Sequence, residues 1–393
     1  MGVTAAIVGL AVLVMIHEAG HFFAARAVGM TPRKFYLGFG PPILKRTRGG
    51  VEYAIGSIPL GGYVKIPGMN RPSPGEFALT LKPEQREEHA AELQALDAAL
   101  GESDWPAARA VVEQLGPALG QTRGWQELEM AVADDAYWRQ TTWRRLVVIG
   151  AGPAINLFFA FLLFLGIFLV STTVVTRTIG SVLPKTPAAS VHLHAGDRVV
   201  RIAGHTFVPD KLAAHIRATK GRPFELVVLR HGKRVTIGPV RAKLDQGVYR
   251  IGIKMEAKTG PGESLPTASK DAVTLAWDVI SSTVGGLGQL ATGKHTKDIS
   301  STVGIVRVSA QAWRAGLSDF LQVLGLVSLA LGILNLLPVL PLDGGHIVIA
   351  LVEKIRGRTF RQSVYLRYSA VGLTLVAVLM YFGLRNDLFG GGN

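Results

Sequence analysis

The chain has 393 residues, of which 48% are hydrophobic and only 18% are charged, and its formal net charge is +14. Soluble globular proteins carry about 25% charged residues, so this composition indicates a surface that faces lipid. The basic residues form no dense block interleaved with aromatic residues, which argues against nucleic acid as a partner. The chain has no cysteine, which excludes disulfides and thiolate metal ligands.

Four uncharged segments are predicted to cross a lipid bilayer. A helix needs about 20 apolar residues for this, and the two middle segments reach that length comfortably. The first reaches it only if the helix continues through His17–His21 to Ala25, and the last is at the lower limit. The alternative is four buried helices of a soluble core, which runs of this length disfavour. The segments are Met1–Ile16, Leu146–Thr176, Phe320–Leu342 and Tyr368–Leu384.

The positive charges predict the orientation in the membrane. No Lys or Arg precedes the first segment, whereas residues 26–145 hold fifteen and the loop before the last segment holds five. Short loops rich in Lys and Arg stay in the cytoplasm, so both termini are expected outside it. Residues 177–319 then lie outside as well, because long domains cross a membrane regardless of their charge.

The segments between the spans differ in character. Residues 34–67 alternate aromatic and β-branched residues with Gly and Pro, and Arg48–Gly50 is a plausible hairpin turn, which predicts a small sheet against the membrane. Residues 72–135 are rich in Ala, Glu, Gln and Leu, which predicts two or three short helices. Residues 178–258 have the rhythm of a compact β-rich domain, and residues 270–311 are amphipathic and expected on the outer surface.

These patterns divide the chain into nine predicted segments. They are a first transmembrane helix (1–25), a cytoplasmic membrane-associated β-loop (26–71), a helical cytoplasmic insert (72–142), a second transmembrane helix (143–176), an extracytoplasmic β-rich domain (177–260), an amphipathic juxtamembrane segment (261–319), a third transmembrane segment (320–352), a cytoplasmic loop (353–367) and a fourth transmembrane helix (368–385).

The first span contains a metal-binding pattern, His17-Glu18-Ala19-Gly20-His21. Residues four apart share one face of a helix, so both imidazoles can bind one zinc ion at ~2.0–2.1 Å. Glu18 lies beside them, where it can accept a proton from metal-bound water and pass it to a leaving amine. Each ionisable residue costs ~2.5–3.5 kcal/mol inside a span. A metal site explains three of them better than contact with lipid headgroups does.

Asp343 is the predicted third ligand, since catalytic zinc takes three protein ligands. It follows a hydrophobic segment interrupted by Pro338 and Pro341, and interrupted backbone is tolerated in a membrane only where it lines a protein cavity. Both ligand-bearing segments run inward from outside and reach the cytoplasmic half of the membrane. A simple acid at a helix end is the alternative for Asp343. His346 is expected to be structural rather than a ligand.

A polar patch on the second span allows two interpretations. Gly152, Pro153 and Asn156 lie at its inner end, where small residues let helices approach closely. The other interpretation is that Asn156 lines the metal site. Packing is the favoured interpretation, and both stay open at this point.

The motifs in this order resemble the site-2 proteases, the M50-type intramembrane zinc metalloproteases, in the bacterial branch typified by the regulator-of-sigma-E protease. The resemblance includes a PDZ-like α/β domain at 177–260. It departs in having one such domain, a P-x-x-P spacing at Pro338 and an insert at 72–135 that has no counterpart. The matching motifs are HEAGH at 17–21, GFGP at 38–41, IPLGGYVKI at 58–66, AGPAINL at 151–157 and NLLP…LDGGH at 335–346.

The resemblance implies a fold and a function. The fold is a multi-pass α-helical membrane protein with four spans, a membrane-associated β-loop and one PDZ-like domain, in the inner membrane of a bacterium. The function is regulated intramembrane proteolysis, with Zn²⁺ as cofactor and the lipid bilayer as surroundings. Substrates are membrane proteins cut within or near their transmembrane segments, such as anti-sigma factors and signal-peptide remnants.

Substrate contacts are also implied. The β-loop is expected to pair with unwound substrate by strand addition, with Tyr53, Ile55, Gly61 and Gly62 among the binding positions. The alternative for the loop is a plain structural hairpin. Asn335 is expected to help hold the substrate. The PDZ-like domain is expected either to bind a freshly exposed C-terminal peptide or to exclude uncut ectodomains by size.

Two functions of other classes compete with proteolysis. A membrane scaffold with a structural zinc would not need Glu18. A metal transporter would have several acids across its spans, whereas the spans of this chain hold essentially Glu18 and Asp343 alone.

Overall fold

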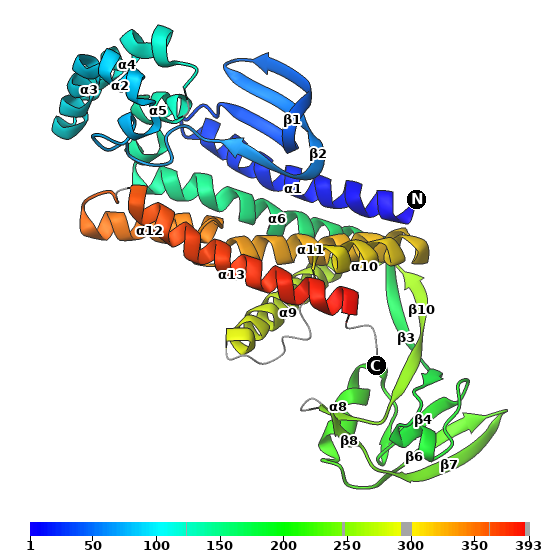
Figure 1. Ribbon diagram of the computed structural model, residues 1–393. Coiled ribbons are helices and arrows are strands. Elements are labelled where there is room, and N and C mark those ends of the chain that lie inside the picture. Colours follow the sequence, from blue (N-terminus) through cyan, green and yellow to red (C-terminus); the bar gives the residue numbers. More distant parts are fainter. Residues whose placement is uncertain (123, 246–247, 292–300, 361, 390–393) are drawn as a thin grey trace. The chain divides into compact units, whose positions relative to one another are not determined.

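The computed structural model describes residues 1–393 except 123, 246–247, 292–300, 361 and 390–393 (Figure 1). The chain divides into two compact units. The first comprises Met1–Leu165 and Ser269–Asn393, and the second comprises Gly166–Ala268.

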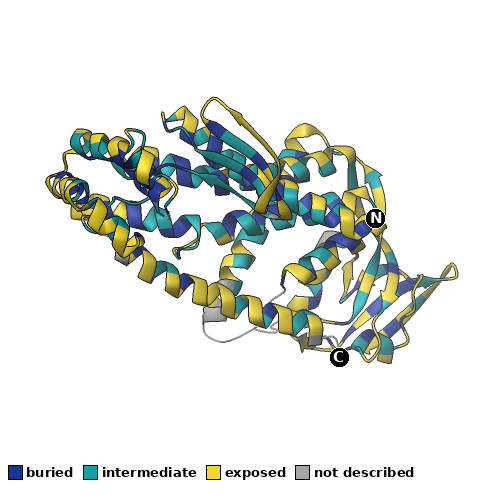
Figure 2. Cartoon of the chain, turned by 45° about the horizontal axis from the view of Figure 1, so that its top comes forward, coloured by how far each residue is buried: buried dark blue, intermediate teal, exposed yellow. Residues whose placement is uncertain are grey.

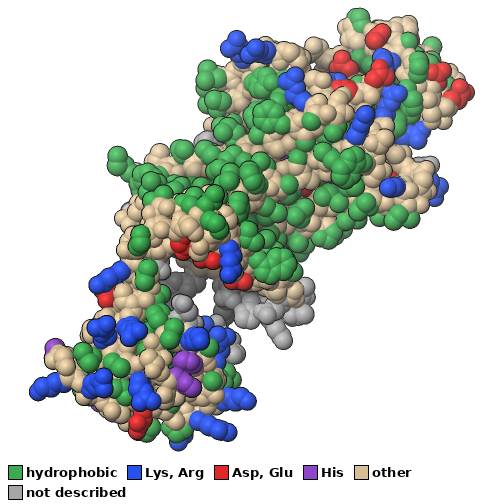
Figure 3. All heavy atoms as spheres, turned by 180° about the vertical axis from the view of Figure 1, so that it is seen from behind, with side chains coloured by type: hydrophobic (Ala, Val, Ile, Leu, Met, Phe, Trp, Pro, Cys, Tyr) green, Lys and Arg blue, Asp and Glu red, His purple; other side chains and the backbone are tan. Residues whose placement is uncertain are grey.

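Within the described residues, four helices are long and apolar enough to cross a membrane. They are α1 (Gly2–Ala27), α6 (Thr142–Val170), α11 (Leu317–Asn335) and α13 (Gln362–Phe389). At most 39% of the residues in the most apolar window of any of them are buried inside the protein, so much of this apolar surface is open to lipid. Most of α13 is exposed (Figure 2), and hydrophobic side chains gather over the helices of this unit (Figure 3).

The second predicted span is too long. The helix ends at Val170, and strand β3 (Ser171–Val182) follows directly, so the prediction that the helix continues to residue 176 is wrong. Residues 171–176 are Ser, Thr and Val, and β-branched side chains favour strands. Absence of charge alone does not distinguish such a strand from the end of a transmembrane helix.

The third hydrophobic segment is broken where its prolines lie. Helix α11 ends at Asn335, and α12 (Asp343–Arg356) begins at Asp343, with both prolines in the turn between them. The turn is so tight that a Cβ on Gly344 would lie 2.2 Å from the Leu336 carbonyl oxygen. A Cβ on Gly345 would lie 2.5 Å from the Leu340 nitrogen. The two glycines therefore allow Asp343 to start a helix immediately after the turn.

The predicted amphipathic segment forms α9 (Leu265–Ala291) and α10 (Thr302–Ala315) in the described residues. Helix α10 packs against α1 so closely that a Cβ on Gly2 would lie 2.9 Å from the Ala310 carbonyl oxygen. The placement of residues 270–311 on the outer surface of the membrane stays a prediction, since this contact with the start of α1 does not contradict it for α10. Its small residues Gly304, Ser309, Ala310 and Ala312 are buried, which permits the close packing.

The β-loop consists of β1 (Lys34–Arg48) and β2 (Val51–Lys65), joined by the predicted turn at Gly49 and Gly50, which both have positive φ. Each strand bends, so the two pair in several registers. The result is four adjacent stretches in the order 44–48, 51–55, 34–37 and 62–65. The outer stretches, 44–48 and 62–65, are the edges of this sheet.

The expected free edge at Tyr53 and Ile55 is wrong. Tyr53 pairs with both Phe35 and Arg46. Ile55 pairs with both Leu37 and Leu44, so both residues have neighbouring strands on either side. Strand addition at these positions is therefore blocked. The alternation of residue types predicted the strands, but it contained no information on how far each strand bends back.

The insert contains four α-helices in the described residues, not two or three. They are α2 (Pro83–Glu88), α3 (Ala90–Glu102), α4 (Trp105–Leu119) and α5 (Trp125–Val132), flanked by the short 3₁₀ turns η1 (Ala78–Thr80) and η2 (Tyr137–Arg139). Asp104 caps α4, because its Oδ1 accepts a hydrogen bond from the Ala107 amide at 3.1 Å. Leu96, Val112 and Trp125 belong to a shared apolar core, so the insert folds as a small helical layer.

The second unit is a β-rich domain, as expected. Its main sheet has the order β10-β3-β4-β6-β7, with β5 paired to β4 and a separate hairpin of β8 and β9. Buried Ile202, Phe207 and Leu226 belong to its core. The predicted hairpin at 231–233 joins β6 to β7. The elements after β3 are α7 (Pro187–Ser190), β4 (Arg198–Ile202), β5 (His205–Thr206), η3 (Pro209–Lys211), α8 (Leu212–Ala218), β6 (Phe224–Arg230), β7 (Lys233–Val240), β8 (Lys243–Asp245), β9 (Val248–Arg250) and β10 (Ile253–Pro261).

Candidate metal centre

The structure brings His17, His21 and Asp343 together. The two histidines lie one turn apart on the buried face of α1, and their Nε2 atoms are 3.2 Å apart. Oδ2 of Asp343, the first residue of α12, lies 3.1 Å from Nε2 of His17 and 3.3 Å from Nε2 of His21. Three potential ligand atoms from two helices therefore surround one point.

These distances fit a zinc ion. Tetrahedral bonds of ~2.0–2.1 Å place two ligand atoms ~3.3–3.4 Å apart, close to the three distances above. Oδ2 of Asp343 is buried and has no hydrogen-bond donor among the described residues. A cation satisfies such an oxygen, whereas an empty cluster of lone pairs leaves it uncompensated. No other group of three or more His, Asp or Glu in the described chain has ligand atoms this close together.

Helix α6 orients both imidazoles. Nδ1 of His21 donates to the Val148 carbonyl oxygen at 2.8 Å, which leaves the Nε2 lone pair free for a metal. The Asn156 side-chain nitrogen lies 3.3 Å from Nδ1 of His17, while its side-chain oxygen is buried without a partner. The two amide atoms exchange places by a half-turn, and the oxygen then accepts the Nδ1 proton of His17. Asn156 thus lines the site.

Helix α6 also packs tightly against α1. A Cβ on Gly152 would lie 2.3 Å from Nε2 of His21 and 2.9 Å from Cε1 of His17. A Cβ on Gly20 would lie 2.6 Å from the Ala151 carbonyl oxygen. Both interpretations of the polar patch on the second span therefore hold: its glycine allows close packing, and its asparagine contacts a histidine.

Glu18 lies between the histidines and the β-loop. Its carboxylate interacts electrostatically with both histidines and with Asp343, and it accepts a hydrogen bond from the Val64 main chain. A Cβ on Gly62 would lie 3.5 Å from Cγ of Glu18. The sheet edge 62–65 is therefore the part of the β-loop that adjoins Glu18.

The structure also gives the positions of Gly61, Asn335 and His346. Gly61 has a φ of 80° and packs against the Phe39 ring, so it forms a bend before the edge. Asn335 is the last residue of α11, and its amide makes no hydrogen bond to a described residue. His346 lies one turn after Asp343, next to Tyr365, and is not part of the ligand group.

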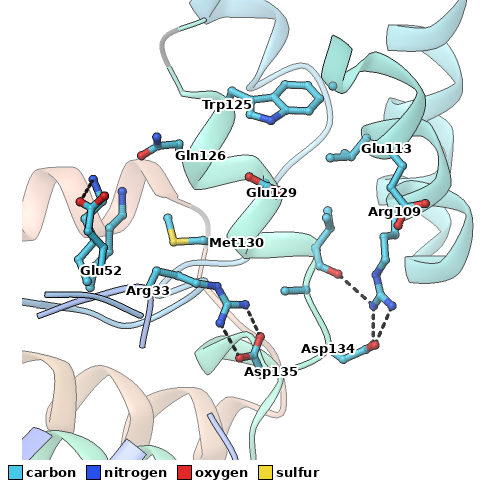
Figure 4. A pocket seen from close by; sticks show the side chains of 16 residues that line it. Arg33, Glu52, Arg109, Glu113, Trp125, Gln126, Glu129, Met130, Asp134 and Asp135 are labelled. Atoms are coloured by element: carbon cyan, nitrogen blue, oxygen red, sulfur yellow. Dashed lines mark hydrogen bonds and ion pairs between the residues drawn. The ribbon is translucent and has the colours of Figure 1, made fainter. Parts of the chain in front are cut away.

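A cavity of about 830 Å³ lies elsewhere in the same unit. It is bounded by the β-loop and by helices α4 and α5 (Figure 4). Its charges are largely paired with one another, as in the Arg33–Asp135 and Arg109–Asp134 ion pairs. None of the predicted site residues lines it. The candidate site is therefore the group of His17, His21 and Asp343, because potential metal ligands converge there and not in this cavity.

Helices able to cross a membrane, a converging group of metal ligands and an adjacent glutamate are the features of a membrane-bound metallopeptidase. Comparison with known proteins agrees. The model of a family described as Peptidase family M50 matches residues 5–379. The chain therefore belongs to Peptidase family M50.

Several curated relatives match nearly the whole chain. Probable protease eep of Enterococcus faecalis is 27% identical over 97% of this chain and 97% of its own length. Metalloprotease MmpA of Caulobacter vibrioides is 28% identical over 96% of this chain and 93% of its own length. Zinc metalloprotease RasP of Bacillus licheniformis is 25% identical over 96% of each. The prediction of a site-2-type zinc metallopeptidase is confirmed by the family and by these names.

Proposed function

We propose that His17, His21 and Asp343 hold the catalytic zinc and that Glu18 is the general base and acid of peptide hydrolysis. The observation that carries this proposal is the 3.1–3.3 Å separation of the three ligand atoms. Two histidines and a carboxylate leave one position of a tetrahedral zinc open for reactants.

The chemistry follows from these positions. Zinc, when bound, lowers the pKa of water to about 7 and polarises a carbonyl oxygen. Glu18 takes a proton from the attacking water and returns it to the leaving amine. Val148 and Asn156 hold each imidazole in the tautomer that directs Nε2 at the metal.

The substrate in this proposal is a peptide bond within or near a transmembrane segment. Helices α1 and α6, both long and apolar enough to cross a membrane, flank the site, so the reacting bond must reach it from the bilayer. A transmembrane helix hides its carbonyls in its own hydrogen bonds, and cleavage requires local unwinding. An added strand on a sheet edge can replace those hydrogen bonds.

We place strand addition at 62–65 because Glu18 adjoins that edge. The opposite edge, 44–48, lies three strand spacings away, about 14 Å. In this scheme Gly62 lets the substrate backbone approach, and the amide of Asn335 hydrogen-bonds to the substrate. Tyr53 and Ile55 have no part in main-chain pairing.

The proposal extends to the second unit and to the location of the protein. The second unit is a PDZ-like domain that binds the freshly exposed C-terminus of a substrate, with exclusion of uncut ectodomains by size as the alternative. It lies outside the cytoplasm, as do both termini, and the protein resides in the inner membrane of a bacterium. The Lys and Arg content of residues 26–145 supports this orientation.

The test compares wild type with Glu18→Gln in a membrane proteome and in a purified assay. The variant should keep stoichiometric zinc while cleavage falls by ~10²–10⁴, the usual loss when a general base is removed. His17→Ala and Asp343→Ala should lose the zinc itself. Unchanged cleavage in Glu18→Gln would refute the role of Glu18, and absence of cleavage by wild type would favour a scaffold with a structural zinc. Stoichiometric zinc in the double ligand mutant would refute the metal site.

A further inference from the structure

A second pair of charged residues is buried in the same unit and takes no part in the chemistry above. Nη2 of Arg145 lies 2.7 Å from Oε2 of Glu353, and the two side chains are only 5% and 4% exposed. Arg145 is in the first turn of α6, and Glu353 is in the last turn of α12. Buried ion pairs lose much of their attraction to desolvation, so packing alone would be served as well by apolar residues.

Further contacts tie this pair to its surroundings. Oε1 of Glu353 accepts a hydrogen bond from the Phe360 amide at 2.7 Å and one from the Tyr365 hydroxyl at 3.2 Å. The Arg145 guanidinium lies 4.9 Å from the centre of the Tyr137 ring. Glu353, on α12, therefore binds side chains of both α6 and α13. Hydrogen bonds and ion pairs of this kind depend on the relative position of the helices.

The two helices of the pair are also the helices that set the metal site. On α6, Arg145 is followed at helical spacing by Val148, Gly152 and Asn156, the three residues that contact the histidines. On α12, Glu353 is ten residues from Asp343, which is about 15 Å along one uninterrupted helix. Helix α6 thus orients two ligands directly, and it holds the helix of the third ligand through Arg145.

We infer that Arg145 and Glu353 are positioning residues for the metal centre. Their pairing fixes α12 against α6, so that Oδ2 of Asp343 stays beside both imidazoles. This inference rests on the proposed metal site. The pair touches neither metal nor substrate, and it acts on the geometry of the third ligand.

The test measures the metal site directly in the full-length protein. Glu353→Gln keeps the shape and one acceptor oxygen but leaves Arg145 without its counter-charge. The readouts are the visible absorption of bound Co²⁺, which reports ligand geometry, the zinc affinity by chelator competition, and the thermal unfolding curve. We expect a changed Co²⁺ spectrum and zinc binding weakened at least tenfold in the folded protein.

Asp197→Asn is the matched control. Asp197 is 2% exposed and pairs with Arg230 at 2.7 Å, but it belongs to the second unit. This variant also takes a buried carboxylate's charge away from its arginine, so it should lower thermal stability without altering the Co²⁺ spectrum or the zinc affinity. A similar loss of zinc in both variants would mean that neutralising any buried carboxylate of an ion pair has this effect, and it would overturn the inference.

A milder variant covers the case in which Glu353→Gln does not fold. Tyr365→Phe removes the hydrogen bond that the uncharged Tyr365 hydroxyl donates to Glu353. This variant keeps the ion pair, and it should weaken zinc binding several-fold. An unchanged spectrum and affinity in whichever variant folds would reduce the pair to a stabilising contact. Failure of the proposed function looks different, because wild type would then bind Co²⁺ no better than Asp343→Ala does.

Discussion

Gly152→Ala should damage the metal site through a single methyl group. The added Cβ would lie 2.3 Å from Nε2 of His21 and 2.5 Å from its Cε1, and 2.9 Å from Cε1 of His17. Carbon and nitrogen atoms in contact lie about 3.5 Å apart, so the rings must move by roughly 1 Å. That movement breaks the contact of His21 with Val148 or separates the two ligand nitrogens.

Gly150→Ala, two residues earlier in α6, provides the matched control. A Cβ there meets no atom within 4 Å. Alanine in a helix interior is favoured over glycine by about 0.5–1 kcal/mol, so this variant should be slightly more stable than wild type. At Gly152 the same gain is opposed by overpacking of ~1–3 kcal/mol. A ligand shift of ~1 Å should also cost about 10²-fold in turnover.

The assay measures zinc content, zinc affinity and cleavage of a membrane substrate in both variants. Gly152→Ala should lose zinc affinity and activity together, and extra zinc should restore the activity only partly. Gly150→Ala should match wild type in all three measurements. Normal zinc affinity in Gly152→Ala would show that α6 can move away from α1, and the argument that α6 sets the imidazole positions would fail.

Three further predictions follow from other parts of the chain. Val64→Pro removes the main-chain donor that hydrogen-bonds to Glu18, so it should slow cleavage of a stable transmembrane helix and of a Gly-rich variant alike; unchanged cleavage would show that this contact has no part in catalysis. Burial opposes ionisation of Asp197, but hydrogen bonds from Arg230 and the His194 amide outweigh it and lower the pKa of Asp197. The ionised carboxylate therefore stabilises the fold above the unfolded pKa of about 3.9, and this stabilisation is lost as pH falls through the lower folded value. The unfolding temperature of the second unit should fall in acid, and Arg230→Ala should reduce this dependence because only the His194 amide then remains as donor. Cysteines introduced at Gly50 and Gly357 should be labelled only from the cytoplasmic side and one at Gly232 only from outside, whereas reversed labelling would refute the orientation.

The convergence of the three candidate metal ligands could be predicted from the sequence because each has a local signature. His17 and His21 are one helical turn apart, and Asp343 follows two prolines that interrupt an apolar segment. The substrate edge could not be predicted in the same way. Tyr53 and Ile55 alternate as edge residues do, but their positions in the sheet depend on strands that bend back and pair in several registers.

Two other features were unpredictable for related reasons. The end of the second span was misplaced because residues 171–176 are apolar or hydroxyl-bearing and suit a strand as well as a helix. The Arg145–Glu353 pair could not be predicted, because Arg145 is one of fifteen basic residues in 26–145 and Glu353 starts the segment predicted as a cytoplasmic loop, although it belongs to α12. Only the packing of α6 on α12 distinguishes this pair from charges at the membrane surface.

Helix α6 carries no predicted ligand, yet it contacts both helices that carry the proposed ligands. The α1 histidines are oriented by Val148 and Asn156, and the α12 carboxylate is held through Arg145. When ligands come from two helices, the positions of those helices must be fixed relative to each other, because a tetrahedral ion tolerates little error in ligand position. Helix α6 contacts both and can fix them, which accounts for Gly152, Asn156 and Arg145 on its otherwise apolar face. Substitutions on this face should therefore affect zinc affinity before they affect substrate affinity, and the reverse order is expected for the sheet edge at 62–65.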